Sequence, residues 1–262
     1  MQKINPKIYN KKYFNSERCE GFFEYKKNRL SPIKLIQIGL LNLQKDDRVL
    51  DLWCGRGDIP YYLSKKGYNV WGSDYSKDAI EMTRRRIASK YRKQIFLCDA
   101  RKKIVEKIKF HKVIVGDVVE HMTFRDALNL VNNAYLSLEE GGILLIHTAP
   151  NIWFKKYTYP IAKIALKLLR FEKVIKKLEE NIEGTRNYHI DEYNPISLIK
   201  LMKESKFSEY KVWVNRDAVR EQSSNYLNPI KKSSLLKTII WLINNSPLIY
   251  LFGNDLFAIA KK

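Results

Sequence analysis

Three aspartates stand at or near the ends of three successive predicted strands, where carboxylates could bind a ligand. Asp51 lies in VLDLWCG, Asp74 ends NVWGSD and Asp99 follows QIFLC, while Gly55 and Gly57 come after the first strand. A buried strand rarely tolerates an unpaired carboxylate, and glycines let the backbone approach a ligand closely. Taken singly, each aspartate reads as a helix cap or turn former. Together they predict an adenosine pocket, in which Asp74 accepts both ribose hydroxyl protons and Asp99 reaches the adenine edge.

Strands and helices alternate through the part of the chain that carries these residues. Residue patterns predict strands over 48–53, 69–74, 94–100, 111–117 and 141–150, and helices over 59–67, 76–91 and 124–140. Ser76 is a suitable N-cap for the second helix. This alternation is typical of a doubly wound, mostly parallel α/β sheet. Such sheets bind ligands beyond the carboxyl ends of their strands, where the loop at 54–58 would lie.

The loop sequence separates two classes of cofactor that contain adenosine. A dinucleotide site would have a third glycine in G-x-G-x-x-G and would place a pyrophosphate at the helix N-terminus. Here Pro60 occupies that third position, and Asp58 puts a negative charge at the start of the helix. S-adenosylmethionine instead carries a sulfonium and an ammonium group, which carboxylates attract. Asp51 is then expected to hold the loop amides and, directly or through water, the methionine ammonium group.

Residues 46–151 resemble the class I S-adenosylmethionine-dependent methyltransferases of the ubiquinone-biosynthesis-like group (methyltransferase type 11). The resemblance rests on VLDLWCGRGDIPYYLSKKGYNVWGSDYS, FLCDA, VIVGDVVEHM and LEEGGILLIHTAPN, in which Glu120 and His121 match the family's Glu-His pair. Trp53 replaces the family's first glycine, and its ring is expected to point away from the cofactor. The resemblance implies that S-adenosylmethionine is the cofactor and that its site is lined by Asp51, Trp53, Gly55, Gly57, Asp74, Tyr75, Asp99, Ala100, Asp117 and His121.

The same resemblance implies a Rossmann-like seven-stranded sheet, mostly parallel with an antiparallel last strand, together with helical cap insertions. A helix at 194–207, strand six at 209–214 and strand seven at 255–262 would complete the sheet. The predicted domains are an N-terminal helical cap over 1–45 and a methyltransferase domain over 46–262.

Insertions at 151–193 and 215–253 are expected to lie on the acceptor side and to choose the methyl acceptor. In the first, apolar residues at 3-4-3-4-3 spacing predict one helix over 161–178, either a lid packed on the core or a surface for anionic lipid or a polyanionic substrate. Its other face is basic, with Lys163, Lys167, Arg170, Lys173, Lys176 and Lys177. In the second, 233–252 is very apolar and predicts a buried helical hairpin, with an interfacial membrane contact as the alternative. Together the two segments favour an anionic, amphiphilic acceptor.

His189, in RNYHIDEYNP, is the predicted catalytic base, because it leads into the helix before strand six on the expected acceptor side. The alternative is that this histidine only anchors its loop by hydrogen bonds. His121 is predicted to line the cofactor pocket, whereas His111 and His147 are predicted to be structural. No cluster of Asp, Glu and His residues in the sequence predicts a catalytic metal.

Net charge and composition limit the possible partners and the cellular location only loosely. The 262 residues carry a net charge of +20, which either permits anionic partners or reflects a lysine-rich composition. Three scattered cysteines, no signal-peptide pattern and no apolar run of about 18 residues favour the cytoplasm, with peripheral contact at an anionic membrane left open.

The predicted activity is O-methylation of a small-molecule, glycan or lipid-linked acceptor. The alternatives are an RNA methyltransferase, motivated by the charge and by RRR at 84–86, and a non-catalytic methyltransferase-like binding or scaffold protein. An enzyme that methylates amino groups of DNA would show [DN]-P-P-[YF] after strand four, where this chain has DVVEH. Nucleic acid is therefore the less favoured partner.

Overall fold

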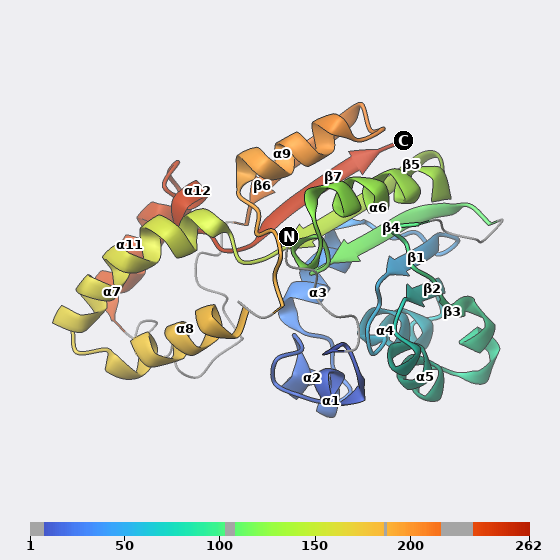
Figure 1. Cartoon of the computed structure of the whole chain (residues 1–262), viewed down its shortest axis with the longest axis horizontal. Helices are drawn as coiled ribbons and strands as arrows, with labels where there is room; N and C mark the ends of the chain where they lie inside the picture. Colours follow the sequence, from blue (N-terminus) through green and yellow to red (C-terminus); the bar gives the residue numbers. More distant parts are fainter. Residues whose placement is uncertain (1–7, 103–107, 186–187, 216–232) are drawn as a thin grey trace.

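The computed structural model describes residues 8–102, 108–185, 188–215 and 233–262, and its centre is a seven-stranded sheet. The strand order is β3-β2-β1-β4-β5-β7-β6 (Figure 1). The strands are β1 Arg48–Leu52, β2 Asn69–Asp74, β3 Ile95–Leu97, β4 Phe110–Gly116, β5 Leu138–Thr148, β6 Glu209–Val214 and β7 Leu256–Lys261. Neighbouring strands from β3 to β5 are parallel, whereas β7 runs antiparallel between β5 and β6. The predicted fold class and antiparallel last strand are confirmed.

The central strands are apolar on both faces, as is typical of parallel sheets that helices cover on both sides. Leu50 of β1 is fully buried and pairs with Trp71 of β2 and Val113 of β4. Because β1, β2 and β4 run in the same direction, the loops that follow them meet at one edge of the sheet. Most of the predicted ligand residues lie near the ends of these strands or on the loops that follow them.

Capped helices cover the two faces of the sheet (Figure 1). On one face are α6 Phe124–Ser137 and α9 Pro195–Glu204, and near the other are α3 Pro32–Leu40, α4 Asp58–Lys65 and α5 Lys77–Arg86. Ser76 caps α5 as predicted, since its hydroxyl accepts the Ala79 N–H. The helices α4, α5, α6 and α9 all end before their predicted last residues, and the cause is visible for α5 and α6. The backbone is extended at Ile87 after α5, before a 3-10 turn at Ser89–Gln94, and Leu138 leaves α6 to pair with Phe110 in the sheet.

The N-terminal segment is fastened to the loop after β1. It contains α1 Lys11–Phe14 and α2 Phe22–Lys26 before α3. The buried Arg56 guanidinium donates to the carbonyl oxygens of Phe14 (2.8 Å) and Glu20 (2.6 Å). It also pairs with Asp58, which accepts from Lys34 at 2.7 Å. This network holds the segment over the carboxyl end of β1.

The insertion after β5 forms a helical hairpin, so the prediction of one helix over 161–178 is wrong. A π-helical segment, Phe154–Thr158, leads into α7 Tyr159–Leu168, and α8 Glu172–Thr185 follows. Arg170 has a left-handed backbone (φ +58°), which reverses the chain. Leu166 of α7 then packs against Val174 and Ile175 of α8. The turn breaks the predicted apolar stripe and leaves the apolar residues of its first half on the outside.

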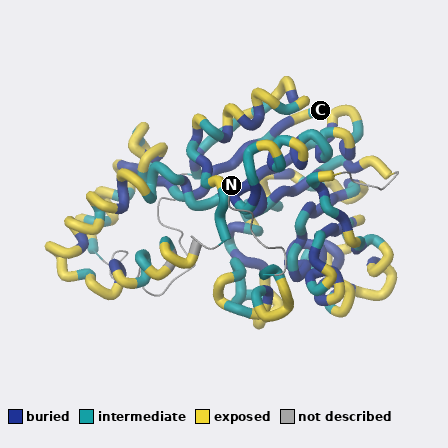
Figure 2. The backbone as a smooth tube through the Cα atoms, viewed as in Figure 1, coloured by how far each residue is buried: buried dark blue, intermediate teal, exposed yellow. Residues whose placement is uncertain are grey.

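The second insertion does not form the buried hairpin that the sequence predicted. It contains α11 Ser234–Asn244 and α12 Ile249–Phe252, while 216–232 lie outside the described residues. Trp241 is 63% exposed and Leu235 64%, as are Ile164 (65%) and Leu168 (80%) of α7. Figures 1 and 2 show α7, α8, α11 and α12 together as a largely exposed lobe beside the sheet. We call these four helices the acceptor lobe. No helix of the described residues is long and apolar enough to span a membrane.

Candidate active site

Protein atoms pack closely against both glycines of the loop between β1 and α4. Gly55 (φ +53°) and Gly57 (φ +77°) have left-handed backbones that favour glycine. A Cβ on Gly57 would lie 2.4 Å from Thr83 Cγ2 of α5, and one on Gly55 would lie 3.3 Å from the Phe14 ring. Protein atoms therefore fill the space on the Cβ side of both glycines. The glycines let α5 and the N-terminal segment close onto the loop.

Asp74, at the end of β2, ties this loop to the second strand. Its Oδ2 accepts the Gly55 N–H at 2.9 Å, and its Oδ1 accepts the Ser76 N–H at 2.8 Å. Burial raises the pKa of Asp74 to about 6, although these backbone hydrogen bonds lower it. Each carboxylate oxygen has two acceptor positions. Asp74 therefore keeps acceptor capacity for a ribose hydroxyl at the predicted place.

Asp51 lies inside the neighbouring strand, in register with Gly72 of β2. Burial raises its pKa to about 8, and the charges of Asp58 and Asp74 act in the same direction. The Gly55 amide binds Asp74, so the expectation that Asp51 holds the loop amides is wrong at this position. A cationic group beside Asp51 would favour its ionised form. The expected contact of Asp51 with the methionine ammonium group stays a prediction.

Trp53 and Tyr75 form an aromatic pair beside this carboxylate edge. Their ring centroids lie 4.7 Å apart, and the Arg101 guanidinium lies 5.6 Å from the Trp53 centroid. Arg101 also forms two 2.8 Å hydrogen bonds with Asp99, which lower the pKa of that carboxyl. The Trp53 ring packs against Tyr75 and the main core cluster, and its expected orientation away from the cofactor stays a prediction. The sequence analysis missed Arg101, which occupies both oxygens of Asp99.

A buried charged triad lies where β4, β5 and β7 meet. The His147 ring is 3.0 Å from Asp117 Oδ1 through Nδ1 and 3.0 Å from Asp255 Oδ1 through Nε2. Burial alone would lower the pKa of His147, but the two carboxylates raise it to about 10. The imidazole is therefore charged at neutral pH and holds Asp117, which has a left-handed backbone (φ +56°). Ala100, also predicted to line the cofactor, is buried, and its carbonyl oxygen accepts from Asn133 at 2.7 Å.

Glu120 fastens the loop that carries His189. Its carbonyl oxygen accepts the N–H groups of Ile190 (2.9 Å) and Asp191 (3.2 Å). Its buried carboxylate accepts from the Thr148 hydroxyl at 2.7 Å. Burial first, and the nearby Asp117 charge second, raise the pKa of Glu120. The Glu120 backbone thus holds the loop of the predicted base, while its side chain ties this turn to the end of β5.

His121 faces the same point from the loop after β4. Its Nδ1 lies 2.7 Å from the Tyr188 carbonyl oxygen and 2.9 Å from the Tyr9 hydroxyl. Burial first, and the neighbouring His189 second, lower the pKa of His121 to about 4, so its ring is neutral. The N-terminal Tyr9 was not among the predicted site residues, since nothing in its local sequence marks it.

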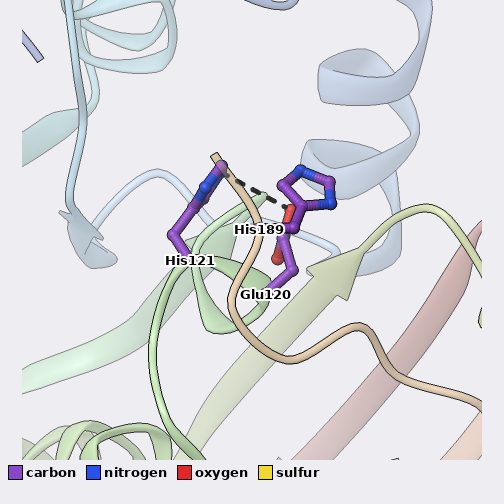
Figure 3. Close-up of side chains that lie close together, drawn as sticks. All are labelled: Glu120, His121 and His189. Carbon is purple, nitrogen blue, oxygen red and sulfur yellow. Dashed lines mark ion pairs between the residues drawn. The ribbon is translucent and has the colours of Figure 1, made fainter. Parts of the chain in front are cut away.

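His189 lies against His121, with ring centroids 4.9 Å apart (Figure 3). Its Nδ1 is 3.2 Å from Glu192 Oε1, and Lys155 donates to the same carboxylate oxygen at 2.9 Å. Burial opposes the ionisation of Glu192, but these partners lower its pKa below the usual value. Ligand atoms of Glu120, His121 and His189 all lie within 4.8 Å of one another. The sequence predicted no such cluster, because His189 is distant along the chain.

Comparisons with known proteins identify the domain that carries most of this site. A family model described as a methyltransferase domain matches residues 49–142. A probable cobalt-precorrin-6B C(15)-methyltransferase of Methanocaldococcus jannaschii is 34% identical over 85 residues, which are 32% of this chain and 46% of that protein. The ubiquinone biosynthesis O-methyltransferase of Actinobacillus pleuropneumoniae is 26% identical over 211 residues, which are 70% of this chain and 79% of that protein. This chain spans about half the length of the first curated relatives that it matches.

A solved structure extends the likeness of fold to almost the whole chain. A SAM-dependent methyltransferase from Archaeoglobus fulgidus has a TM-score of 0.56 and 20% sequence identity, covering 92% of this chain and 98% of that one. At this identity the likeness is one of fold. Together, the matched model, the strand order and the likeness to solved structures show that residues 49–142 form a methyltransferase domain and that the chain has the fold of S-adenosylmethionine-dependent methyltransferases.

Proposed function

We propose that the chain transfers the methyl group of S-adenosylmethionine to an oxygen atom of a small-molecule acceptor. The observation that carries this proposal is the position of Asp74, which binds the glycine loop through Gly55 at the strand end where a ribose would lie. The acceptor oxygen attacks the methyl carbon in line, the carbon–sulfur bond breaks, and its electron pair stays on sulfur. The protein mainly supplies proximity and alignment for this step.

Methylation of oxygen is supported by the histidine cluster and by one relative. A hydroxyl acceptor must lose its proton, and a base within hydrogen-bond reach speeds that loss. His189 is the proposed base, held by Glu192 and by the backbone contacts of its loop to Glu120. The likeness to an O-methyltransferase spans most of both chains. The likeness to a precorrin C-methyltransferase leaves about two thirds of this chain without a counterpart.

For the acceptor, we propose an anionic amphiphile such as a lipid-linked saccharide, met at an anionic membrane surface. The support is the acceptor lobe, which exposes large apolar side chains on α7, α11 and α12: Ile161, Ile164, Leu168, Leu235, Ile239, Trp241, Leu242, Leu248 and Tyr250. Residues 155–185 also carry eight Lys and Arg against four Glu. Lys155, Lys163 and Lys177 pair with Glu192, Glu179 and Glu180, so the remaining cations provide the attraction. Apolar area beside positive charge is the pattern of helices that lie at anionic interfaces.

The RNA alternative is weakened by the contacts of the RRR segment. Arg84 donates to the carbonyl oxygen of Ile95 at 2.9 Å, and Arg86 pairs with the buried Asp58 at 2.7 Å. These two guanidinium groups support the fold, whereas phosphate contacts would need accessible ones. The scaffold alternative rests on Trp53, a large side chain in a glycine position, and a turnover assay separates it from the enzyme.

Ligand binding followed by turnover tests the proposal. S-adenosylhomocysteine at about 100 times its Kd should add about 2.7 kcal/mol of stability, or roughly 5–10 °C in Tm for a chain of this size. Asp74→Ala should lose most of this shift, whereas Asp46→Ala, at an exposed position, should keep it. No shift in the wild type would overturn the cofactor assignment.

Labelled S-adenosylmethionine, offered with lipid, glycan, small-molecule and RNA fractions, then reports the acceptor. Label in a lipid or glycan product supports the proposal. Binding without any transfer supports the scaffold reading, and label in RNA with a steep salt dependence supports the nucleic-acid reading.

A further inference from the structure

The side chains of Glu120, His121 and His189 lie close together (Figure 3). Glu120 and His121 come from the turn after β4, and His189 comes from the loop before α9. His121 Nε2 lies 4.0 Å from Glu120 Oε1, and one ligand atom of each residue lies within 4.8 Å of the others. Glu120 is buried, while the two rings are about 10% exposed, so the space between the three side chains is sheltered yet reachable.

Hydrogen bonds fix which nitrogen of each ring has a free lone pair. The Tyr188 carbonyl oxygen, 2.7 Å from His121 Nδ1, can only accept, so this Nδ1 carries the proton. The Glu192 carboxylate, 3.2 Å from His189 Nδ1, imposes the same tautomer on the second ring. The lone pair of each imidazole is therefore on Nε2. Metal-binding histidines are oriented in this way, with the other ring nitrogen donating to a carbonyl or a carboxylate.

The carboxylate of Glu120 is oriented as well. Its Oε2 accepts the Thr148 hydroxyl at 2.7 Å, which leaves Oε1 on the side of His121. A buried carboxylate is costly without a compensating positive charge, and a cation between Oε1 and the two Nε2 atoms would provide one.

We propose that Glu120, His121 and His189 bind one divalent transition-metal cation of the zinc class. Two imidazoles and one carboxylate are a donor set that Zn²⁺ takes in sites that keep a fourth position open. Zinc bonds of about 2.0–2.2 Å require the three ligand atoms to draw closer than they are now. Small shifts of the side chains must supply that movement, since His121 ends the 3-10 turn Val119–His121 and His189 lies on the loop before α9.

The cation would change the role of His189. A hydroxyl bound at the open position loses its proton more readily, because the cation stabilises the oxygen anion. His189 Nε2 would then be a ligand and not a base, and the proton would pass to solvent. Metal binding stands on the geometry alone, whereas this catalytic role rests on the proposed function.

Titration with Co²⁺, which has visible absorption bands in protein sites, tests the binding. The full chain, first stripped with EDTA, should bind one equivalent and lose that equivalent to excess Zn²⁺. His189→Ala should weaken Co²⁺ binding at least 100-fold, and Glu192→Gln should weaken it about 10- to 100-fold by releasing Nδ1. His111→Ala, at a histidine that contacts Asp47 and Glu139 instead, should bind as the wild type does. No saturable binding, or equal affinity in His189→Ala, would overturn the site.

Two further measurements distinguish a loss of metal binding from a loss of folding, and a structural metal from a catalytic one. The S-adenosylhomocysteine melting shift should survive in His189→Ala, which shows that the variant is folded and that the cofactor site is independent. Once an acceptor is known, EDTA should remove turnover and Zn²⁺ should restore it. Full turnover in the stripped enzyme would return His189 to the role of base and overturn the catalytic part of the inference.

Discussion

The cofactor half of the molecule and the acceptor lobe use apolar residues in opposite ways. Around β1 and β4 the apolar residues are fully buried, and even the charged Arg56, Asp74 and His147 lie inside. In the lobe, helices of similar apolar content turn Ile164, Trp241 and their neighbours to solvent (Figure 2). An apolar pattern in the first region therefore reports a core. In the second region the same pattern does not report a core.

The largest expected difference between the two regions is the loss of stability when a charged side chain is removed. His147 sits between Asp117 and Asp255, whereas Lys163 and Glu179 form an exposed ion pair on the lobe. Removing one member of a buried charged group costs about 3–5 kcal/mol, and an exposed pair is worth at most about 1 kcal/mol. His147→Gln should lower the free energy of unfolding by about 3–5 kcal/mol at pH 6, and Lys163→Met by less than 1 kcal/mol, in urea titrations.

The pH dependence of this difference follows from the raised pKa of His147. A histidine with a raised folded-state pKa contributes stability that is complete below its unfolded value near 6.5. That stability is lost as the pH rises towards the folded value of about 10. The gap between wild type and His147→Gln should therefore shrink from pH 6 to pH 10. A gap that stays constant would mean that the imidazole is neutral.

The next largest expected difference is the change in stability when a glycine is replaced by alanine. Gly57 has φ +77°, and a Cβ there would meet Thr83 at 2.4 Å, whereas Gly184 in α8 has nothing within 4 Å. Gly57→Ala should cost about 2–4 kcal/mol, since it adds backbone strain and overpacking. Gly184→Ala should stabilise by a few tenths of a kcal/mol or more, because alanine favours a helix. Thermal unfolding of the two variants measures this. Equal effects would mean that the loop can shift away from α5.

The sequence predicted the first region well because local signals and tertiary packing agree there. The alternation of strands and helices, the cap at Ser76 and the strand-end position of Asp74 can each be read from a few neighbouring residues. The acceptor lobe was predicted poorly because the backbone conformation of one residue, Arg170, makes its first insertion two helices instead of one. The left-handed turn at Arg170 divides a continuous 3-4 apolar pattern into two helices, and no glycine or proline marks that turn.

The candidate site was predicted in part for the same reason. The residues that follow β1 and β2 have a short motif, so Asp74 and the two glycines could be named. Tyr9, Arg101 and Glu192 reach the site from segments without a motif, and only the fold brings them there. A sequence also does not show that Thr83 and Phe14 pack on the Cβ side of the two glycines.

The smallest expected effect is the change in vesicle binding when residues of the acceptor lobe are substituted. Each Lys near an anionic surface contributes about 1 kcal/mol, so Lys167→Gln with Lys173→Gln should lower binding to phosphatidylglycerol vesicles about 30-fold at low salt. Trp241→Ser should lower it further, because burying a large apolar side chain gives about 1.5–3 kcal/mol. Leu136→Ser on α6, whose leucine is 48% exposed, is the matched control and should bind as the wild type does. Co-sedimentation with anionic and with neutral vesicles measures all three. If the wild type binds neither, the exposed apolar residues of the lobe serve another partner, and the membrane proposal is overturned while the cofactor assignment stands.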